Sequence, residues 1–168
     1  RPLQILWVNL VTDGLPAMAL GVDPPDPDLM ERSPRSKNEN IFARGLARRI
    51  LTRGVLIGIT TTLVFAGTML HADDLKLART MAFATLVFCQ LFHVFDCRSE
   101  TMGIMEKGLF SNPYLIVAVL LSSLMFWAAL YVPPLRTLFD TVALDTSQWL
   151  VVLAAAGMPT VVIGLRRL

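Results

Sequence analysis

Residues 115–132 read LIVAVLLSSLMFWAALYV and contain no charged side chain. A helix of about 20 residues crosses the hydrocarbon core of a bilayer, which is about 30 Å thick. Four further stretches have comparable length and apolar character. The sequence therefore predicts an all-α membrane protein with five transmembrane helices, over residues 3–20, 50–70, 78–95, 114–132 and 148–165.

The overall composition supports the same fold class. Of 168 residues, 54% are hydrophobic and 17% are charged, which is more apolar than an ordinary soluble domain. A soluble helical bundle is the alternative, but an uncharged run such as 115–132 has no polar face to present to water. The surroundings we expect are a lipid bilayer, and no nucleic acid is expected as a partner.

Basic residues are distributed unevenly between the two sides of the predicted membrane. Eleven of the 15 Lys and Arg residues lie between the first two spans, between the third and fourth spans, or after the fifth. The positive-inside rule places those segments in the cytoplasm. We therefore expect a multi-pass protein with its C-terminus in the cytoplasm.

The chain begins at Arg1 rather than Met and has no charged region or cleavage site before its first apolar run. It does not resemble a signal peptide there, and we expect it to start inside a larger polypeptide. It also lacks a Gly-rich nucleotide-binding loop and a D-K-T-G phosphorylation motif. No catalytic residue is therefore expected in this chain, and an ATP-hydrolysing site would have to lie elsewhere in the polypeptide.

The two cysteines, Cys89 and Cys97, are about 12 Å apart along one predicted helix, too far for a disulfide. Cys89 and His93 are spaced i, i+4 and could share a soft metal. Two ligands do not complete such a site. We interpret both as packing residues.

The connection 21–49 opens with DPPDPD at positions 23–28. Its prolines remove backbone donors and disfavour helix, so a stiff, extended loop is expected. The acidic residues Asp26, Asp28 and Glu31 could simply be solvated, or they could dock a partner domain. In the second span, Gly54 and Gly58 form a G-x-x-x-G pair that permits close helix packing.

The most informative segment, residues 6–17, reads LWVNLVTDGLPA. On an α-helix Asn9, Thr12 and Asp13 are spaced i, i+3 and i+4, which gathers an amide, a hydroxyl and a carboxylate on one face near the middle of the span. An ionisable residue at that depth costs several kcal/mol, about 2.5–3.5 on insertion scales, and by default marks an ion or proton pathway.

Gly14 and Pro16 follow directly after these polar residues. Pro16 cannot donate to the carbonyl of Thr12, so the first helix should be interrupted near Gly14–Pro16. Interrupted helices that expose backbone oxygens are a recurrent way of building cation sites in membranes. The alternative is an ordinary turn between two shorter interfacial helices.

The third span contributes Gln90 and His93, spaced i, i+3. Gln90 is either a neutral oxygen ligand or a hydrogen-bonding partner of another helix. His93 is interpreted as a hydrogen-bonded packing group.

The run QILWVNLVTDGLPA at 4–17 resembles the sixth transmembrane span of sarco/endoplasmic-reticulum-type calcium pumps, which are P-type ATPases. The Pro-Pro-Asp and Ser-Pro-Arg that follow are similar to the next cytoplasmic loop of that family. Residues 80–100 resemble the eighth span and its exit, and residues 143–150 the beginning of the tenth. By this resemblance, 1–168 is a C-terminal transmembrane domain with spans six to ten of a ten-span pump.

The resemblance implies functional roles for several positions. Asn9, Thr12 and Asp13 would be calcium ligands, with Asp13 contacting both ions where two are bound. Gln90 stands where two-ion pumps carry a Glu, as it does in plasma-membrane-type pumps that move one ion. The loop 21–49, with Asp26, Asp28 and Glu31, would couple the membrane site to the phosphorylation domain.

The resemblance also implies that ATP and Mg²⁺ bind in catalytic domains absent from this chain, and that upstream spans and the phosphorylation domain are its partners. Calcium is favoured as the transported ion, because hard oxygen ligands suit it better than copper or zinc. The alternatives are an ion-gradient-driven exchanger or channel half, a purely structural membrane subunit, and a sodium/potassium-type or manganese-transporting P-type ATPase. By analogy with bacterial members, a bacterial plasma membrane is expected.

Overall fold

The computed structural model describes residues 2–26, 30–31, 42, 45–98 and 108–165. All regular structure in these residues is helical, which confirms the predicted fold class. The elements are α1 (Pro2–Trp7), the π-helical segment η1 (Val8–Asp13), α2 (Gly14–Leu20), α3 (Leu46–Ala72), α4 (Leu75–Asp96), the 3₁₀ turn η2 (Leu109–Ser111), α6 (Pro113–Tyr131), α7 (Pro133–Phe139) and α8 (Thr146–Leu165).

Within the described residues, five helical stretches are long and apolar enough to cross a membrane, as the sequence predicted. The predicted boundaries are correct to within four residues at each end. The observed spans are Pro2–Leu20, Leu46–Ala72, Leu75–Asp96, Pro113–Tyr131 and Thr146–Ile163.

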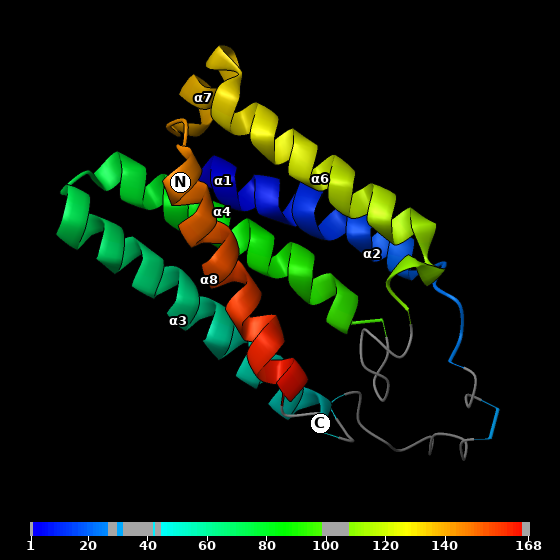
Figure 1. The fold of residues 1–168 in the computed structure, drawn as a ribbon. Coiled ribbons are helices and arrows are strands. Elements are labelled where there is room, and N and C mark those ends of the chain that lie inside the picture. Colours follow the sequence, from blue (N-terminus) through cyan, green and yellow to red (C-terminus); the bar gives the residue numbers. More distant parts are fainter. Residues whose placement is uncertain (1, 27–29, 32–41, 43–44, 99–107, 166–168) are drawn as a thin grey trace.

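Helix α4 lies at the centre of the bundle. It contacts α3, α8 and η1, while α2 and η1 contact α6 on the other flank. Figure 1 shows the first span running between α4 and α6, with α8 crossing in front of α4. Eleven residues of α4 are buried, more than in any other described helix. The polar residues of the first span are therefore held against the most enclosed helix.

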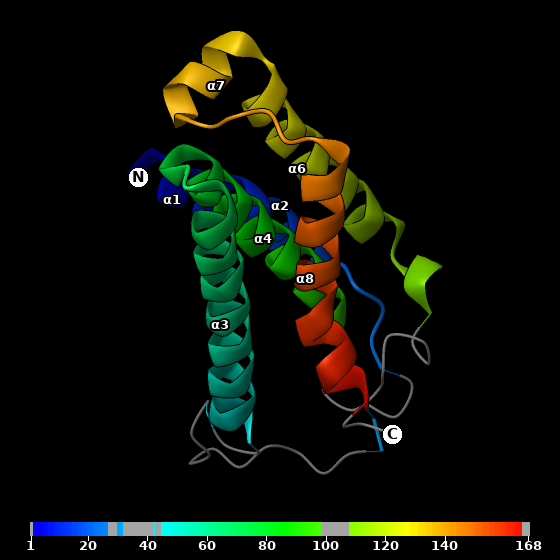
Figure 2. The ribbon, with the colours of Figure 1, turned by 60° about the vertical axis from the view of Figure 1, so that its left-hand side comes forward.

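The two ends of the bundle differ. In Figure 2 the start of α1, the α3–α4 turn and α7 lie at one end, while the start of α3 and the end of α8 lie at the other. We call these the turn end and the loop end. The first helix starts at the turn end and the last helix finishes at the loop end, as five membrane crossings require.

The core of the bundle is aromatic. Phe126 of α6 is fully buried, and its ring centroid lies 5.2 Å from that of Phe83 and 5.9 Å from that of Phe88, both in edge-to-face geometry. Phe88 in turn packs edge-on against Trp149 of α8 at 5.5 Å. Such pairs contribute about 0.5–1.5 kcal/mol beyond simple burial, so these rings fix α6 and α8 on α4.

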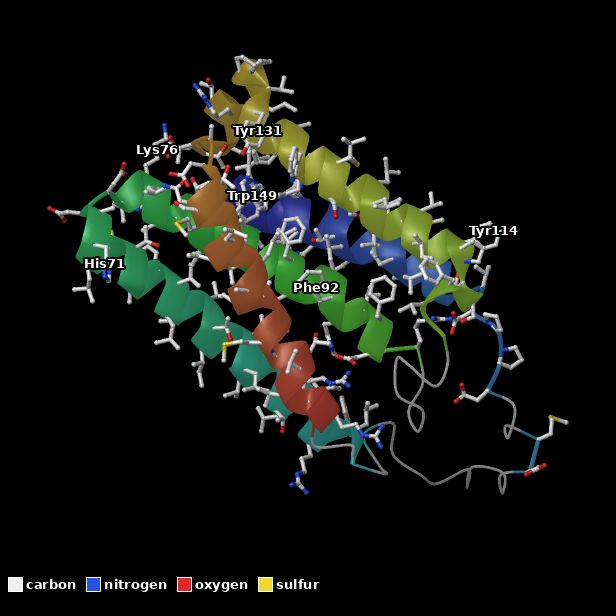
Figure 3. The ribbon with its side chains drawn as sticks, viewed as in Figure 1. His71, Lys76, Phe92, Tyr114, Tyr131 and Trp149 are labelled. Carbon is white, nitrogen blue, oxygen red and sulfur yellow. The ribbon has the colours of Figure 1, made fainter. Side chains whose placement is uncertain are left out.

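Local hydrogen bonds define the turn end. Trp149 Nε1 donates to the Tyr131 hydroxyl at 2.8 Å, and that hydroxyl donates to the carbonyl of Leu144 at 2.7 Å. Figure 3 shows the Tyr131 and Trp149 side chains close together at this end, with Tyr114 at the far end of α6. Tyr and Trp favour the membrane interface because each combines an apolar ring with a polar group.

The short helix α7 is a feature that the sequence did not indicate. Pro133-Pro134 normally mark the end of a helix, but Pro is also well suited to a first helical turn, where its missing N–H is not needed. Phe139 at the end of α7 is buried, and its ring lies 4.9 Å from that of Trp7. The amide of Gln4 also donates to the Phe139 carbonyl at 3.0 Å. The segment thus covers the beginning of the first span.

Helix α3 contrasts with α4. It has no buried residue against the rest of the described structure, although it is 27 residues long. Large apolar side chains point outward along it, including Leu51, Ile59, Leu63 and Leu70. This surface suits lipid or further membrane helices.

Candidate cation site in the first span

The α-helix of the first span widens into the π turn η1 at Val8–Asp13, directly before Gly14. Pro16 has no N–H for the carbonyl of Thr12, and a π turn absorbs this mismatch by taking in an extra residue. The interruption expected near Gly14–Pro16 is present, but it is a wider turn within a continuous helix. The span Pro2–Leu20 is not divided into two interfacial helices.

Side chains from the span itself and from α6 hold this π turn. The buried Thr12 hydroxyl donates to the carbonyl of Val8 within the turn. From α6, the fully buried Ser122 hydroxyl donates to the carbonyl of Val11 at 2.9 Å. Both bonds end on backbone carbonyls of the π turn and so tie its backbone to neighbouring side chains.

Thr12, Asp13 and Gln90 line one cavity of about 530 Å³. Thr12 Oγ1 lies 3.5 Å from Gln90 Oε1, so η1 and α4 meet at these two side chains. Residues near the loop end complete the lining, and among them are Arg49 and Arg53 of α3. We call this space the Asp13 cavity. Its lining includes a carboxylate and a hydroxyl from η1 and an amide from α4.

Asn9 lies apart from this group. It lines a second cavity of about 460 Å³ towards the turn end, together with Gln4, Thr61 and Arg79, which we call the Asn9 cavity. A π turn holds more residues than an α turn, so residues three apart diverge around the axis. The π turn therefore separates Asn9 from Thr12, whereas Asn9 and Asp13, four apart, stay close around the axis. Asn9 and Asp13 nevertheless line different cavities, and Gln90 is the candidate ligand common to both cavities.

The candidate site is incomplete within the described residues, among which no group of three or more His, Cys, Asp or Glu could hold a metal ion. The acidic residues lining the Asp13 cavity are Asp13 and Asp96. Asp96 Oδ2 lies 3.8 Å from His93 Nδ1 near the loop end. Asp13 thus provides one negative charge, and a divalent cation there needs ligands from outside the described structure.

His93 belongs to a polar cluster at the loop end of the Asp13 cavity. Its Nε2 lies 3.5 Å from Arg53 Nη1 and 3.5 Å from Cys97 Sγ. The interpretation of His93 as a hydrogen-bonded group agrees with this geometry, although its partners come from both α3 and α4. Both cysteines are free, Cys89 buried and Cys97 exposed, which confirms that they do not form a disulfide.

The structure bears only in part on the predicted coupling loop and on the predicted packing of Gly54 and Gly58. Asp26 is half-buried and Glu31 is exposed, while Asp28 lies outside the described residues. Added Cβ atoms at Gly54 and Gly58 would meet no described atom within 4 Å. Gly54 does line the Asp13 cavity. The described part of the chain therefore supplies no close partner for the G-x-x-x-G pair.

Sequence reasoning did not identify two sets of polar contacts. Ser122 was part of an apolar run, and its bond to Val11 crosses 111 residues. Arg98 was counted only as a basic residue, yet it is buried and ion-paired with Asp23. A buried charge has no local sequence signal when its partner is distant in the chain.

Comparison with known proteins defines the family. The family model described as "Cation transporting ATPase, C-terminus" matches residues 1–168. The chain therefore belongs to the family of C-terminal domains of cation-transporting ATPases. A helical membrane domain with oxygen ligands beside an irregular turn is consistent with that membership.

Individual relatives carry more specific names. The chain is 51% identical over 161 residues to a calcium-transporting ATPase of Bacillus subtilis, covering 95% of the chain and 18% of that protein. It is 40% identical to calcium-transporting ATPase 1 of Bacillus cereus, covering 96% and 20%. For calcium-transporting ATPase type 2C member 2 of Mus musculus the identity is 41%, covering 83% and 15%. The chain thus spans a fifth or less of the length of these relatives.

Proposed function

We propose that this chain is the C-terminal transmembrane part of an ATP-driven calcium pump and that it contributes Asp13, Thr12 and Gln90 to the transport site. The observation that carries the proposal is that these three oxygen-bearing side chains line one cavity beside a π turn. Calcium prefers carboxylate, carbonyl and other hard oxygen ligands. The names of the relatives point to the same ion.

The remaining parts of the pump lie outside this chain. ATP and Mg²⁺ bind in upstream catalytic domains, and upstream spans supply the charge that Asp13 alone does not provide. The open α3 surface around Gly54 and Gly58 receives one of those spans, since small residues allow helices to approach closely. The five spans are six to ten of a ten-span pump of the sarco/endoplasmic-reticulum type, in a bacterial plasma membrane with the loop end in the cytoplasm.

Asn9 has a separate place in this scheme. It lines the Asn9 cavity, and Gln90 is the described residue that this cavity shares with the lining of the Asp13 cavity. We assign Asn9 as a ligand that joins the site when η1 rearranges during the cycle. Gln90, which lines both cavities, stands between the two positions.

Gln90 also favours one calcium ion per cycle. Two-ion pumps of the family that this chain resembles carry a Glu at this position. At an effective dielectric near 20, two divalent ions about 6 Å apart repel by about 10 kcal/mol, and a neutral amide does not offset that repulsion. The number of calcium ions bound per phosphorylated pump tests this assignment. A ratio near one is expected, and a ratio near two would refute it.

The loop 21–49 couples the site to the phosphorylation domain through Asp26, Asp28 and Glu31. These residues follow the end of α2, which is continuous with the segment that carries Asp13. A displacement of the loop is therefore transmitted along a single helix to the carboxylate.

ATP-driven uptake of radioactive calcium into inverted membrane vesicles, with the full-length protein that contains this chain, tests the function. Calcium uptake should depend on ATP, and manganese, sodium and potassium should inhibit it only weakly. Uptake driven by a sodium or proton gradient without ATP would contradict the proposal. Preferred uptake of manganese would replace calcium as the transported ion.

A further inference from the structure

A buried ion pair lies at the loop end of the bundle, away from the candidate cation site. Arg98 Nε and Nη2 each lie 3.0 Å from Asp23 Oδ1. The Arg98 and Asp23 side chains are only 3% and 8% exposed. Most surface ion pairs contribute little, but separating a buried pair leaves an uncompensated charge and is strongly destabilising.

Asn112 completes this cluster. Its Nδ2 donates to Asp23 Oδ1 at 2.7 Å and to the carbonyl of Ala19 at 3.0 Å, and its Oδ1 accepts from the N–H of Leu115 at 3.0 Å. The last of these bonds caps the start of α6. Asn112 is 1% exposed. We call Asp23, Arg98 and Asn112 the buried anchor.

The Arg98 guanidinium makes two further hydrogen bonds. Arg98 Nη1 donates to the carbonyl of Gly108 at 2.8 Å, and Nη2 donates to the Ser111 hydroxyl. Gly108 has a φ of +82°, a conformation that favours glycine. The backbone before α6 is thus shaped to present a carbonyl to Arg98. The fixed planar fork of arginine fits this set of acceptors, which a lysine ammonium does not reproduce.

The anchor joins three segments at this end by polar contacts, beside an apolar cluster in which Leu20, Phe95 and Leu115 also bring α2, α4 and α6 together. Asp23 lies just beyond α2, Arg98 just beyond α4, and Asn112 just before α6. Asp23 follows Asp13 by ten residues, and Arg98 follows Gln90 by eight, or about 12 Å of helix. Both helices that carry candidate ligands of the Asp13 cavity are therefore tied together close to where they end.

We propose that the buried anchor makes the start of the loop 21–49, α4 and α6 move as one unit, so that a displacement of the loop reaches Gln90 as well as Asp13. Its members are positioning residues that bind no ion themselves. The proposal rests on the proposed pump function and adds a second route, through α4, by which the loop acts on the transport site. Its basis is the shared set of buried hydrogen bonds rather than any single contact.

The test uses Asp23→Asn, Arg98→Gln and the double variant in the full-length protein, with calcium-activated ATP hydrolysis as the readout. Each single variant should lower the maximal rate by about five- to tenfold, while the calcium concentration for half-activation changes by less than about twofold. The double variant should be no slower than the slower single variant, because both changes cut the same connection.

Lys76→Gln is the matched control. Lys76 forms a 3.0 Å ion pair with Asp140 at the turn end, but its side chain is 49% exposed. Its removal should leave the rate and the calcium activation unchanged. If the Arg98→Gln protein does not fold, Arg98→Lys replaces it in the test, because lysine retains the buried positive charge but lacks the planar set of donors of arginine. It should reduce the rate in the same way.

The outcomes separate the two proposals. A wild-type protein that does not transport calcium refutes the pump function. A wild-type protein that transports calcium, together with anchor variants of unchanged rate, overturns the anchor proposal alone. It is also overturned if the calcium activation shifts more than the rate, because the contacts would then shape the resting site rather than transmit movement. Additive losses in the double variant would show two independent contacts and would count against it as well.

Discussion

The hydrogen bond from Ser122 to the π turn offers a sharp test of how the site is held. Ser122 Oγ donates to the Val11 carbonyl at 2.9 Å and is fully buried. The next residue, Ser123, donates to Val119 in its own helix at 2.8 Å. Ser122→Ala removes a bond between α6 and η1, whereas Ser123→Ala removes one within α6. The two substitutions are chemically identical and adjacent, so the second is a matched control for the first.

Hydrogen bonds between helices in a bilayer contribute on average about 0.6 kcal/mol and at most about 1.7 kcal/mol. The full burial of Ser122 places this bond towards the upper part of that range. We expect Ser122→Ala to lower the unfolding free energy by about 1 kcal/mol, equivalent to about a fivefold change in an equilibrium constant. Because Val11 lies next to Thr12 and Asp13, the freed turn must be reordered when calcium binds. The calcium concentration for half-activation should therefore rise by up to the same factor.

The assay is ATP hydrolysis by the purified full-length protein as a function of free calcium, combined with unfolding in mixed detergent micelles. Ser122→Ala should shift both measurements and Ser123→Ala should shift neither by more than about 0.5 kcal/mol. Equal behaviour of the two variants would refute the view that α6 holds the π turn. An effect on stability without any effect on calcium activation would show that η1 is held but that its shape is unimportant for binding.

Two further predictions concern the loop and the start of α8. Replacing Asp26, Asp28 and Glu31 together with Ala should slow ATP turnover by about five- to tenfold while calcium binding is retained, as expected for coupling of about 1 kcal/mol. Unchanged hydrolysis and transport would show that these residues are only a solvated run of charges. Hydrogen bonds from the Gln148 backbone, and then from the side chain and backbone of Ser147, hold the pKa of Asp145 below its ordinary value. The ionised Asp145 therefore stabilises the fold at pH values above its ordinary pKa, and this contribution is lost as the pH falls through the lowered pKa. Asp145→Asn should make the loss of stability less steep as the pH falls below about 4. An identical acid-unfolding curve for the variant would contradict this.

The fold was largely predictable because membrane spans depend on length and apolar content. Residues 115–132 have no charge, and the corresponding helix is Pro113–Tyr131. Helix α7 was not predictable from the same pattern. Its Pro133-Pro134 start reads as a breaker, and its stability depends on the contact of Phe139 with Trp7, distant in the chain.

The candidate site was predictable only in its residue types. Asp13 is a carboxylate inside an apolar span, and Pro16 signals an irregular helix, so both were visible in the sequence. The kind of irregularity was not, and it decides that Asn9 lies in a different cavity from Thr12. The pairing of Arg98 with Asp23 spans 75 positions and leaves no periodic pattern. Such contacts are fixed by the packing of helices rather than by local sequence.

In the proposed pump, Asp13 is the charged ligand of the transported ion. Asp13→Asn in the full-length protein keeps the shape of the side chain but removes its charge, and a divalent cation held by carboxylate oxygens should then bind far more weakly. Calcium-dependent phosphorylation by ATP should disappear, whereas phosphorylation by inorganic phosphate, which uses the ion-free state, should survive. Normal calcium activation of phosphorylation in this variant would contradict the assignment of Asp13 to the transport site.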